Sequence, residues 1–256
     1  MTVWQPVSAC GAGCRLGGHN VVRPAVTVLR VGALCAVLLL GLVLVPLLRR
    51  AAVAGMARAI LAALGVRLVW RGPAPRAGSL LVANHVSWLD IVALLAVTPT
   101  RLVAKCEVRG WPGIGALAAV TGAIFVDRSR PRSLPGTVAE VAAVLRAGRS
   151  VAAFPEGTTY CGVARGRFRP ALFQAAADAG APVVPIAISY DSTAAAFIGD
   201  DTLWSSVRRV AGVRRLTVTL VASPALRPTG GADRKVLARA AQASVGLTPA
   251  ALGLAA

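Results

Sequence analysis

The chain has 256 residues, of which 56% are hydrophobic and only 15% are charged. Such a length allows one sizeable domain with an additional segment, and the composition is too apolar for an ordinary soluble domain. The 28 basic and 10 acidic residues give a net charge of +18, which favours an anionic partner such as phospholipid headgroups or a phosphorylated substrate. We expect no nucleic-acid partner, because the arginines are dispersed and no helix-turn-helix, zinc-finger or RNP pattern occurs.

Residues 1–24 are aperiodic and contain Gly, Arg and Pro, so they are expected to form a flexible tail. Cys10, Cys14 and His19 lie in this tail, but their spacing is poor for a metal site and a fourth ligand is missing. The chain has five scattered cysteines, which imply no disulfide framework. We therefore expect neither a metal nor a cofactor.

The next segment, residues 25–64, is predicted to anchor the chain to a membrane. Its residues 31–48 form an uncharged run of 18 residues, and a helix of that length extends about 27 Å, close to the roughly 30 Å of a hydrocarbon layer. Pro46 is expected to kink or end this helix, and Arg30 is near enough to the other end to snorkel to the interface.

A second helical pattern covers residues 51–64 and places Met56, Ile60 and Leu64 on one face. Two arrangements of the anchor remain open. It forms either one spanning helix followed by an interfacial helix, or a helical hairpin that lies in one leaflet. Arginines flank both sides of the apolar run in similar number, so the positive-inside rule does not settle the orientation.

From residue 65 to residue 245 short apolar runs alternate with helical patterns. The predicted strands are 66–70, 79–83, 101–104, 123–126, 151–154, 183–188 and 216–221. The predicted helices are 88–96, 113–120, 134–147, 169–179 and 232–244. This alternation predicts an α/β fold, with a mixed sheet of about seven strands flanked by helices. Residues 246–256 are expected to be a second tail.

Candidate catalytic residues follow the predicted strand 79–83. The next seven residues are Asn84-His85-Val86-Ser87-Trp88-Leu89-Asp90. On one continuous helix, side chains five positions apart diverge by about 140°. His85 and Asp90 can therefore meet only if the His lies in the turn before a helix and the Asp lies in its first turns. A carboxylate that accepts from one ring nitrogen leaves the other nitrogen available as a base.

Two further polar groups follow predicted strands. The first is Phe154-Pro155-Glu156-Gly157-Thr158-Thr159, in which Pro before and Gly after the Glu predict a tight turn whose N–H groups can hold an anion. The second is Asp127-Arg128, and a guanidinium suits bidentate binding of phosphate. Polar residues at the ends of buried strands are where an α/β protein usually places its site.

These groups resemble the signature of the glycerolphosphate and lysophosphatidate acyltransferase family. The patterns N-H-x-S-x-x-D, G-x-I-F-V-D-R and F-P-E-G-T occur in family order and are followed by an apolar block at 181–186. The resemblance covers roughly residues 60–222. It implies that His85 is the general base, that Asp90 orients it, and that residues 183–186 help to line the acyl site. It implies substrate-binding roles for Asn84, Ser87, Arg128, Glu156, Gly157, Thr158 and Thr159.

The function implied by this resemblance is transfer of a fatty acyl group from acyl-CoA or acyl carrier protein to the free hydroxyl of 1-acyl-sn-glycerol 3-phosphate, which gives phosphatidate for phospholipid synthesis. The donor thioester is already activated, so the enzyme needs a base but no covalent intermediate. The family works at the cytoplasmic face of the membrane. We therefore expect a cell-membrane location with a cytoplasmic catalytic domain, and a lysophospholipid, the acyl donor and the bilayer as partners.

One position departs from many lysophosphatidate enzymes, which have Arg-Ser after E-G-T where this chain has Thr159-Tyr160. Arg165, Arg167 or Arg169 follow on the same loop and can supply the missing cation. Family members that acylate lyso-ornithine lipids resemble the E-G-T-T form, so a lyso-ornithine-lipid or other lysolipid O-acyltransferase is the alternative. A non-catalytic basic protein that binds anionic membrane lipid is the alternative of another class, and the intact His–Asp pair disfavours it.

Overall fold

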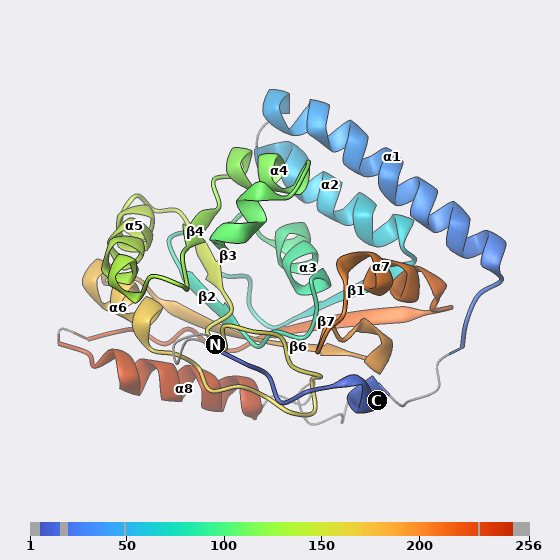
Figure 1. The fold of residues 1–256 in the computed structure, drawn as a ribbon. Coiled ribbons are helices and arrows are strands. Elements are labelled where there is room, and N and C mark those ends of the chain that lie inside the picture. The colour runs from blue at the N-terminus through green and yellow to red at the C-terminus, as the bar shows by residue number, and fades with distance from the viewer. Residues whose placement is uncertain (1–5, 16–19, 49, 230, 248–256) are drawn as a thin grey trace.

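The computed structural model describes residues 6–15, 20–48, 50–229 and 231–247 (Figure 1). Within these residues, seven strands form one sheet in the order β1-β7-β6-β2-β5-β3-β4. The strands are β1 (Val66–Arg71), β2 (Leu80–Ala83), β3 (Arg101–Lys105), β4 (Ile124–Val126), β5 (Val151–Ala153), β6 (Val183–Tyr190) and β7 (Leu216–Ala222). Neighbouring strands are parallel except for β6 and β7, which are antiparallel. The predicted mixed α/β sheet is confirmed.

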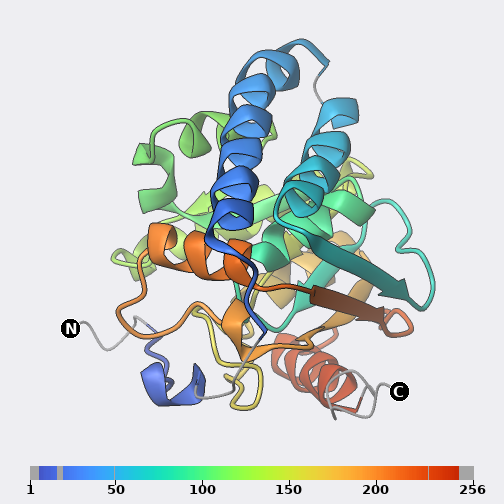
Figure 2. The same ribbon diagram turned by 90° about the vertical axis from the view of Figure 1, so that its right-hand side faces the viewer.

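Helices cover both faces of the sheet (Figures 1 and 2). One side carries α1 (Pro24–Leu48), α2 (Arg50–Ala63), α3 (Leu89–Val97) and α7 (Leu203–Gly212), and the other carries α5 (Leu134–Arg146), α6 (Ala171–Ala179) and α8 (Arg234–Gly246). Helix α4 (Ile114–Val120) lies beside α1. Short 3-10 helices are η1 (Ala12–Arg15), η2 (Cys106–Gly110), η3 (Pro131–Ser133) and η4 (Thr193–Ala195).

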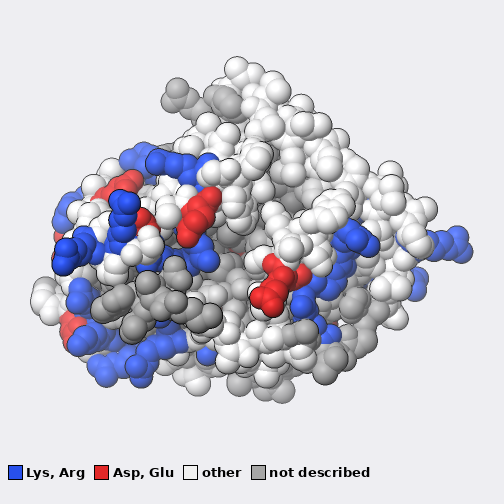
Figure 3. All heavy atoms as spheres, viewed as in Figure 1, with Lys and Arg blue, Asp and Glu red and all other residues white. Residues whose placement is uncertain are grey.

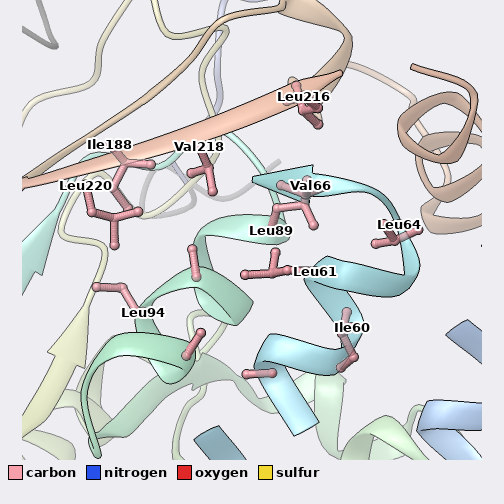
Figure 4. Packing of buried hydrophobic residues seen from close by; sticks show 14 of the residues in the cluster. Ile60, Leu61, Leu64, Val66, Leu89, Leu94, Ile188, Leu216, Val218 and Leu220 are labelled. Atoms are coloured by element: carbon pink, nitrogen blue, oxygen red, sulfur yellow. The ribbon is translucent and has the colours of Figure 1, made fainter. Parts of the chain in front are cut away.

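The alternation of side chains along buried strands divides the interior into two hydrophobic cores. In β2, Leu81 and Ala83 enter one core, whereas Leu80 and Val82 enter the other. Figure 4 shows part of the first core, in which leucines of α2 and α3 pack against side chains of β1 and β7. All four residues of β2 are less than 2% exposed, so this strand fixes the position of whatever follows it.

Helix α7 was not predicted from the sequence. Its apolar residues alternate with Ser and Arg, and Val207 and Val210 lie on one face and are buried in the first core. The Thr202 hydroxyl caps its amino end by accepting a hydrogen bond from the Ser205 N–H at 3.2 Å. The capping residue Thr202 and the helical spacing of Leu203, Val207 and Val210 were the available signals.

Part of the expected flexible tail packs against the domain, which corrects that prediction for residues 6–15. Cys10 is only 6% exposed, and Arg15 pairs with Asp201 at 3.0 Å. A sequence without periodicity gave no sign of these contacts, because each depends on a partner far along the chain. His19 and the residues from 248 to the end of the second predicted tail lie outside the described residues.

Helix α1 is the one described helix that is long and apolar enough to cross a membrane, by length and composition alone. It packs closely against α2. A Cβ atom at Gly41 of α1 would lie 2.3 Å from the sulfur of Met56 in α2, so any side chain at position 41 would displace the methionine. The helix continues two residues past Pro46 before it ends. Arg30, expected to snorkel, instead donates to the carbonyl oxygens of Ala211 and Val213 at 3.0 and 2.6 Å.

Those carbonyl groups lie at the carboxyl end of α7, where a helix leaves acceptors unpaired and its dipole favours a cation. We predict that Arg30→Met lowers the unfolding free energy by about 1.5–3 kcal/mol, the usual range for a charged hydrogen-bonding partner. The exposed Arg23, in the same segment, supplies the control Arg23→Met. Urea unfolding in detergent micelles measures the stability of both variants. Equal unfolding free energies for Arg30→Met and Arg23→Met would show that the bonds from Arg30 to α7 do not stabilise the fold.

Candidate active site

The predicted site residues gather at the carboxyl ends of neighbouring parallel strands. Strands β6, β2 and β5 are adjacent in the sheet. His85 follows β2, Glu156 follows β5, and Tyr190 ends β6. Their convergence follows from topology, because the carboxyl ends of parallel strands open at one edge of the sheet.

His85 and Asp90 form the expected pair. His85 lies in the turn before α3, Asp90 lies in the first turn of that helix, and His85 Nδ1 is 2.8 Å from Asp90 Oδ2. The Asp90 side chain is fully buried and the His85 side chain is 17% exposed. The His85 ring stacks on Phe154, with centroids 4.0 Å apart and planes inclined by 15°. These contacts fix the plane of the imidazole.

The Asp90 carboxylate also holds the turn that carries His85. Its Oδ2 atom accepts the N–H groups of Val86 and Ser87 at 2.6 and 2.9 Å. Its Oδ1 atom accepts the Tyr190 hydroxyl at 2.5 Å. Burial, followed by the charge of Asp90 and the bond to it, raises the pKa of Tyr190, so this phenol remains a donor.

Sequence reasoning missed Tyr190. The strand that contains it was predicted to end at Ile188, and a tyrosine two positions farther has its side chain on the same face of the strand. Both residues belong to the first core or pack against it. A strand extended by two residues would therefore have brought the Tyr190 hydroxyl to the candidate site.

The Glu156 side chain joins its own sequence motif to the motif of His85, because its carboxylate accepts hydrogen bonds from backbone N–H groups. One carboxylate oxygen accepts the His85 N–H at 2.7 Å, and the other accepts the Gly166 N–H at 2.9 Å. The residue is 2% exposed. Burial raises the pKa of Glu156 to about 7, the two N–H donors oppose this shift, and the nearby Asp90 charge adds to it. Glu156 thus connects the turn of the base to the loop after β5.

Asn84 and Ser87 are buried beside the pair. The Asn84 amide spans from β2 to β6 by donating to the Ile188 carbonyl at 2.9 Å and accepting the Ile188 N–H at 2.7 Å. The Ser87 hydroxyl accepts the Leu89 N–H at 3.4 Å. Residues 183–186 lie inside β6, where Val183, Val184 and Ile186 enter the two hydrophobic cores. They support the site from within the sheet.

The loop after Glu156 is held from two sides. Arg128, which follows β4, donates from a guanidinium nitrogen to the Gly157 carbonyl. The Thr159 hydroxyl donates to the Phe197 carbonyl. Gly157 has φ +77°, in the left-handed region that Gly adopts without strain. Thr158 lies between these fixed points and is half-buried.

Arg169 is the second cation at this loop. Its backbone N–H donates to the Pro155 carbonyl at 3.0 Å. Its guanidinium Nε lies 3.7 Å from the position that a Cβ atom would take on Gly157. Arg165 is half-buried and Arg167 is exposed. The structure therefore places two guanidinium groups, from Arg128 and Arg169, around the same glycine. Their positive charge suits an anionic substrate.

This arrangement equips His85 for proton abstraction. In the tautomer whose Nδ1–H donates to the carboxylate, Nε2 is the nitrogen that can accept a proton. Asp90 stabilises the positive charge that develops on the ring when it does so. A hydroxyl placed beside Nε2 would lose its proton as it attacked an acyl carbon.

Comparison with known proteins agrees with this chemistry. The Acyltransferase family model matches residues 68–189. A 1-acyl-sn-glycerol-3-phosphate acyltransferase of Neisseria meningitidis is 37% identical over 177 residues, which are 66% of this chain and 69% of that protein. A lyso-ornithine lipid O-acyltransferase of Pseudomonas aeruginosa is 41% identical over 183 residues, 69% of each chain.

The fold is similar to a solved structure. The crystal structure of the 1-acyl-sn-glycerophosphate acyltransferase PlsC from Thermotoga maritima superimposes with a TM-score of 0.68 at 20% identity. The match covers 86% of this chain and 92% of that one. The likeness therefore includes residues outside the family match.

The raised pKa of Glu156 predicts a pH-dependent stability. The folded protein retains the Glu156 proton up to about pH 7, whereas the unfolded chain loses it near the ordinary value of 4.5. The unfolding free energy contributed by this group is therefore fully present below pH 4.5 and is lost as the pH rises through 7. The change is on the order of 3 kcal/mol.

Glu156→Gln removes this titration. Urea unfolding of both proteins at a series of pH values should give a wild-type-minus-variant difference that falls between pH 4.5 and 7 and is flat above. Subtracting the variant removes the contribution of other titrating groups that the two proteins share. A difference that does not change with pH would show that folding does not shift the pKa of Glu156.

Proposed function

The chain belongs to the acyltransferase family that contains lysophosphatidate and lyso-ornithine-lipid enzymes, and we propose that it acylates the free hydroxyl of 1-acyl-sn-glycerol 3-phosphate. The product is phosphatidate, a precursor of phospholipids. The observation that carries this proposal is the imidazole of His85, held by a buried carboxylate beside a loop that two arginines surround. Acyl-CoA or acyl carrier protein is the proposed donor.

In the proposed reaction, His85 Nε2 accepts the proton of the acceptor hydroxyl while the hydroxyl oxygen attacks the carbonyl carbon of the thioester. The carbon–sulfur bond then breaks, and the imidazolium returns the proton to the leaving thiolate. Asp90 keeps the ring in the required tautomer and stabilises its charge between these steps. The Ser87 oxygen accepts the Leu89 N–H of its own turn, and His85, the one proposed base, already pairs with Asp90, which favours direct transfer over a seryl intermediate.

The remaining site residues divide into two proposed roles. Arg128, Gly157, Thr158 and Thr159 form the acceptor side, where the guanidinium and loop N–H groups meet the phosphate. Asn84, Ser87 and Glu156 support this surface, because their polar atoms bond to the backbone of the turns and strands around it.

We also propose that the chain binds the membrane through a helical hairpin in one leaflet. Six residues on the outer side of α1 are at least 58% exposed: Val28, Leu29, Leu39, Leu40, Val43 and Leu47. In Figure 3 the upper right of the molecule, where α1 lies, is largely free of charge, whereas most Lys and Arg gather at the left and smaller groups lie lower at the right. A spanning α1 would abandon its contacts with α2 and the bonds of Arg30. The catalytic domain is proposed to face the cytoplasm.

A lyso-ornithine lipid is the second candidate acceptor. Thr159 stands where many lysophosphatidate enzymes have Arg, and its hydroxyl is bonded to the backbone of residue 197. The similar Pseudomonas aeruginosa protein is a lyso-ornithine lipid enzyme. The deciding experiment supplies purified protein with one labelled acyl-CoA and a panel of lysolipids, and compares kcat/KM among acceptors.

We predict that His85→Ala lowers kcat about 10²- to 10⁴-fold, the usual contribution of a positioned base. Asp90→Asn should lower kcat by a smaller factor if the turn stays folded, because the imidazole then has the required tautomer part of the time. Single-turnover acyl transfer measures both, and circular dichroism confirms that each protein is folded. Wild-type turnover by folded His85→Ala would falsify the mechanism.

Arg128 is the position that tests the acceptor. Arg128→Ala should raise the KM of a phosphate-bearing acceptor about 10- to 150-fold, because a charge-assisted hydrogen bond contributes roughly 1.5–3 kcal/mol. Arg128→Lys should restore only part of this, since a point charge cannot reproduce the guanidinium fork. The KM of the acyl donor should change little.

Thr159→Arg is the matched gain-of-charge variant. It should favour lysophosphatidate over a lysolipid without a phosphomonoester. Acceptor KM values are measured with the donor saturating. If Arg128→Ala leaves the acceptor KM unchanged, Arg128 does not bind the acceptor phosphate, and Arg169 becomes the remaining candidate.

A further inference from the structure

Three cysteines meet where the amino-terminal segment touches the loop beside the active site. Cys10 and Cys14 come from the start of the chain, and Cys161 follows the Thr159-Tyr160 pair. Their three sulfur atoms all lie within 4.8 Å of one another. Cys10 and Cys161 are 6% and 8% exposed, and all three thiols are free. The convergence joins parts of the chain separated by about 150 positions.

The surroundings of these sulfur atoms suit thiolates. The Cys161 N–H points to Cys10 Sγ at 3.4 Å, and the Ala164 N–H points to Cys161 Sγ at the same distance. The chain also carries a net charge of +18. Its field offsets part of the negative charge that three thiolates would bring.

We propose that Cys10, Cys14 and Cys161 bind one zinc ion, with a fourth position for a small exogenous ligand such as water. Thiolates at about 2.3 Å from a tetrahedral zinc lie about 3.8 Å apart, so the sulfur atoms need to move little to close around it. Three thiols favour a metal over a disulfide, because a disulfide would leave one of them unused. The sequence alone did not indicate this metal site, because the third ligand, Cys161, lies 147 positions beyond Cys14.

Such an ion would fasten the amino-terminal segment across the proposed acceptor loop. A Cβ atom on Gly157 would lie 2.7 Å from Cγ of Pro6, and one on Gly199 would lie 3.8 Å from Cα of Gly11. The segment therefore runs over the glycine whose carbonyl Arg128 holds. Zinc would keep it there as a strap. Only the description of this loop as the acceptor side rests on the proposed function; the metal site does not.

The test measures metal in the purified full-length protein. After equilibration with buffered zinc and removal of free ions, elemental analysis should give one zinc per chain. Cobalt substitution should give sulfur-to-metal charge-transfer bands, whose intensity reports the number of thiolate ligands. Cys10→Ser, Cys14→Ser and Cys161→Ser should each weaken zinc binding more than about 100-fold, beyond the 10- to 100-fold typical of losing an outer-shell partner. Cys35→Ser and Cys106→Ser are matched controls that should bind zinc as the wild type does.

A second measurement reports the strap without substrate or activity. Trypsin cleavage after Arg15 should be slow with zinc bound and at least tenfold faster after chelation, and the Cys14→Ser variant should be cleaved rapidly in both conditions. Substoichiometric zinc in the wild type, or equal zinc in the variant lacking all three cysteines, would overturn the proposal. So would a tryptic map, prepared without reductant from freshly purified protein, in which a disulfide joins Cys10 or Cys14 to Cys161. Because acyl transfer is not measured, these outcomes are independent of the proposed function.

Discussion

The Asp90 carboxylate is the group on which the geometry of the site depends. It is fully buried, and its two oxygens accept hydrogen bonds from His85, from the backbone N–H groups of Val86 and Ser87, and from the Tyr190 hydroxyl. A buried ionised carboxylate is unfavourable unless such donors surround it. The same bonds therefore stabilise the charge, shape the turn and select the tautomer of the base. With Asp90 five positions after His85, the turn brings the His85 ring and the N–H groups of Val86 and Ser87 to the same carboxylate oxygen.

Several residues of the recognised motifs act on the backbone around the site. Asn84 saturates both backbone groups of Ile188, and Glu156 links the N–H groups of His85 and Gly166. Each of these side chains is buried, so an unpaired polar atom there would be costly. Mutational loss of activity at such positions therefore has two sources: direct loss of a substrate contact and displacement of the base. Stability measured alongside kinetics separates them, because a contact with substrate contributes nothing to the free enzyme.

The sequence predicted the sheet well because its strands are short apolar runs that end in polar or Gly-containing turns, and the His–Asp pair because its spacing allows only one geometry. It failed where a contact depends on partners distant in the chain. Tyr190 reaches Asp90 only because β6 lies beside β2, and the tail is held through Cys161 and Asp201. Strand order and such long-range pairings are set by the packing of the whole domain. Local pattern carries no record of them, whereas it does record caps and periodicity, including the Thr202 cap of the overlooked α7.

The proposed anchor and the catalytic turn share one hydrophobic core. Leu61 of α2 and Leu64 just after it pack with Leu89 of α3, one residue before Asp90 (Figure 4). Arg58 of α2 donates to the Ala96 carbonyl at 2.9 Å, near the carboxyl end of α3. Helix α3, which carries Asp90, is thus held by α2, which α1 covers on its other side. If α1 lies in the leaflet with its exposed leucines among acyl chains, this continuous packing fixes the catalytic turn at a set depth relative to the headgroups. A lysolipid, whose chain stays in the membrane while its hydroxyl lies at the interface, is the kind of acceptor for which such a fixed depth matters.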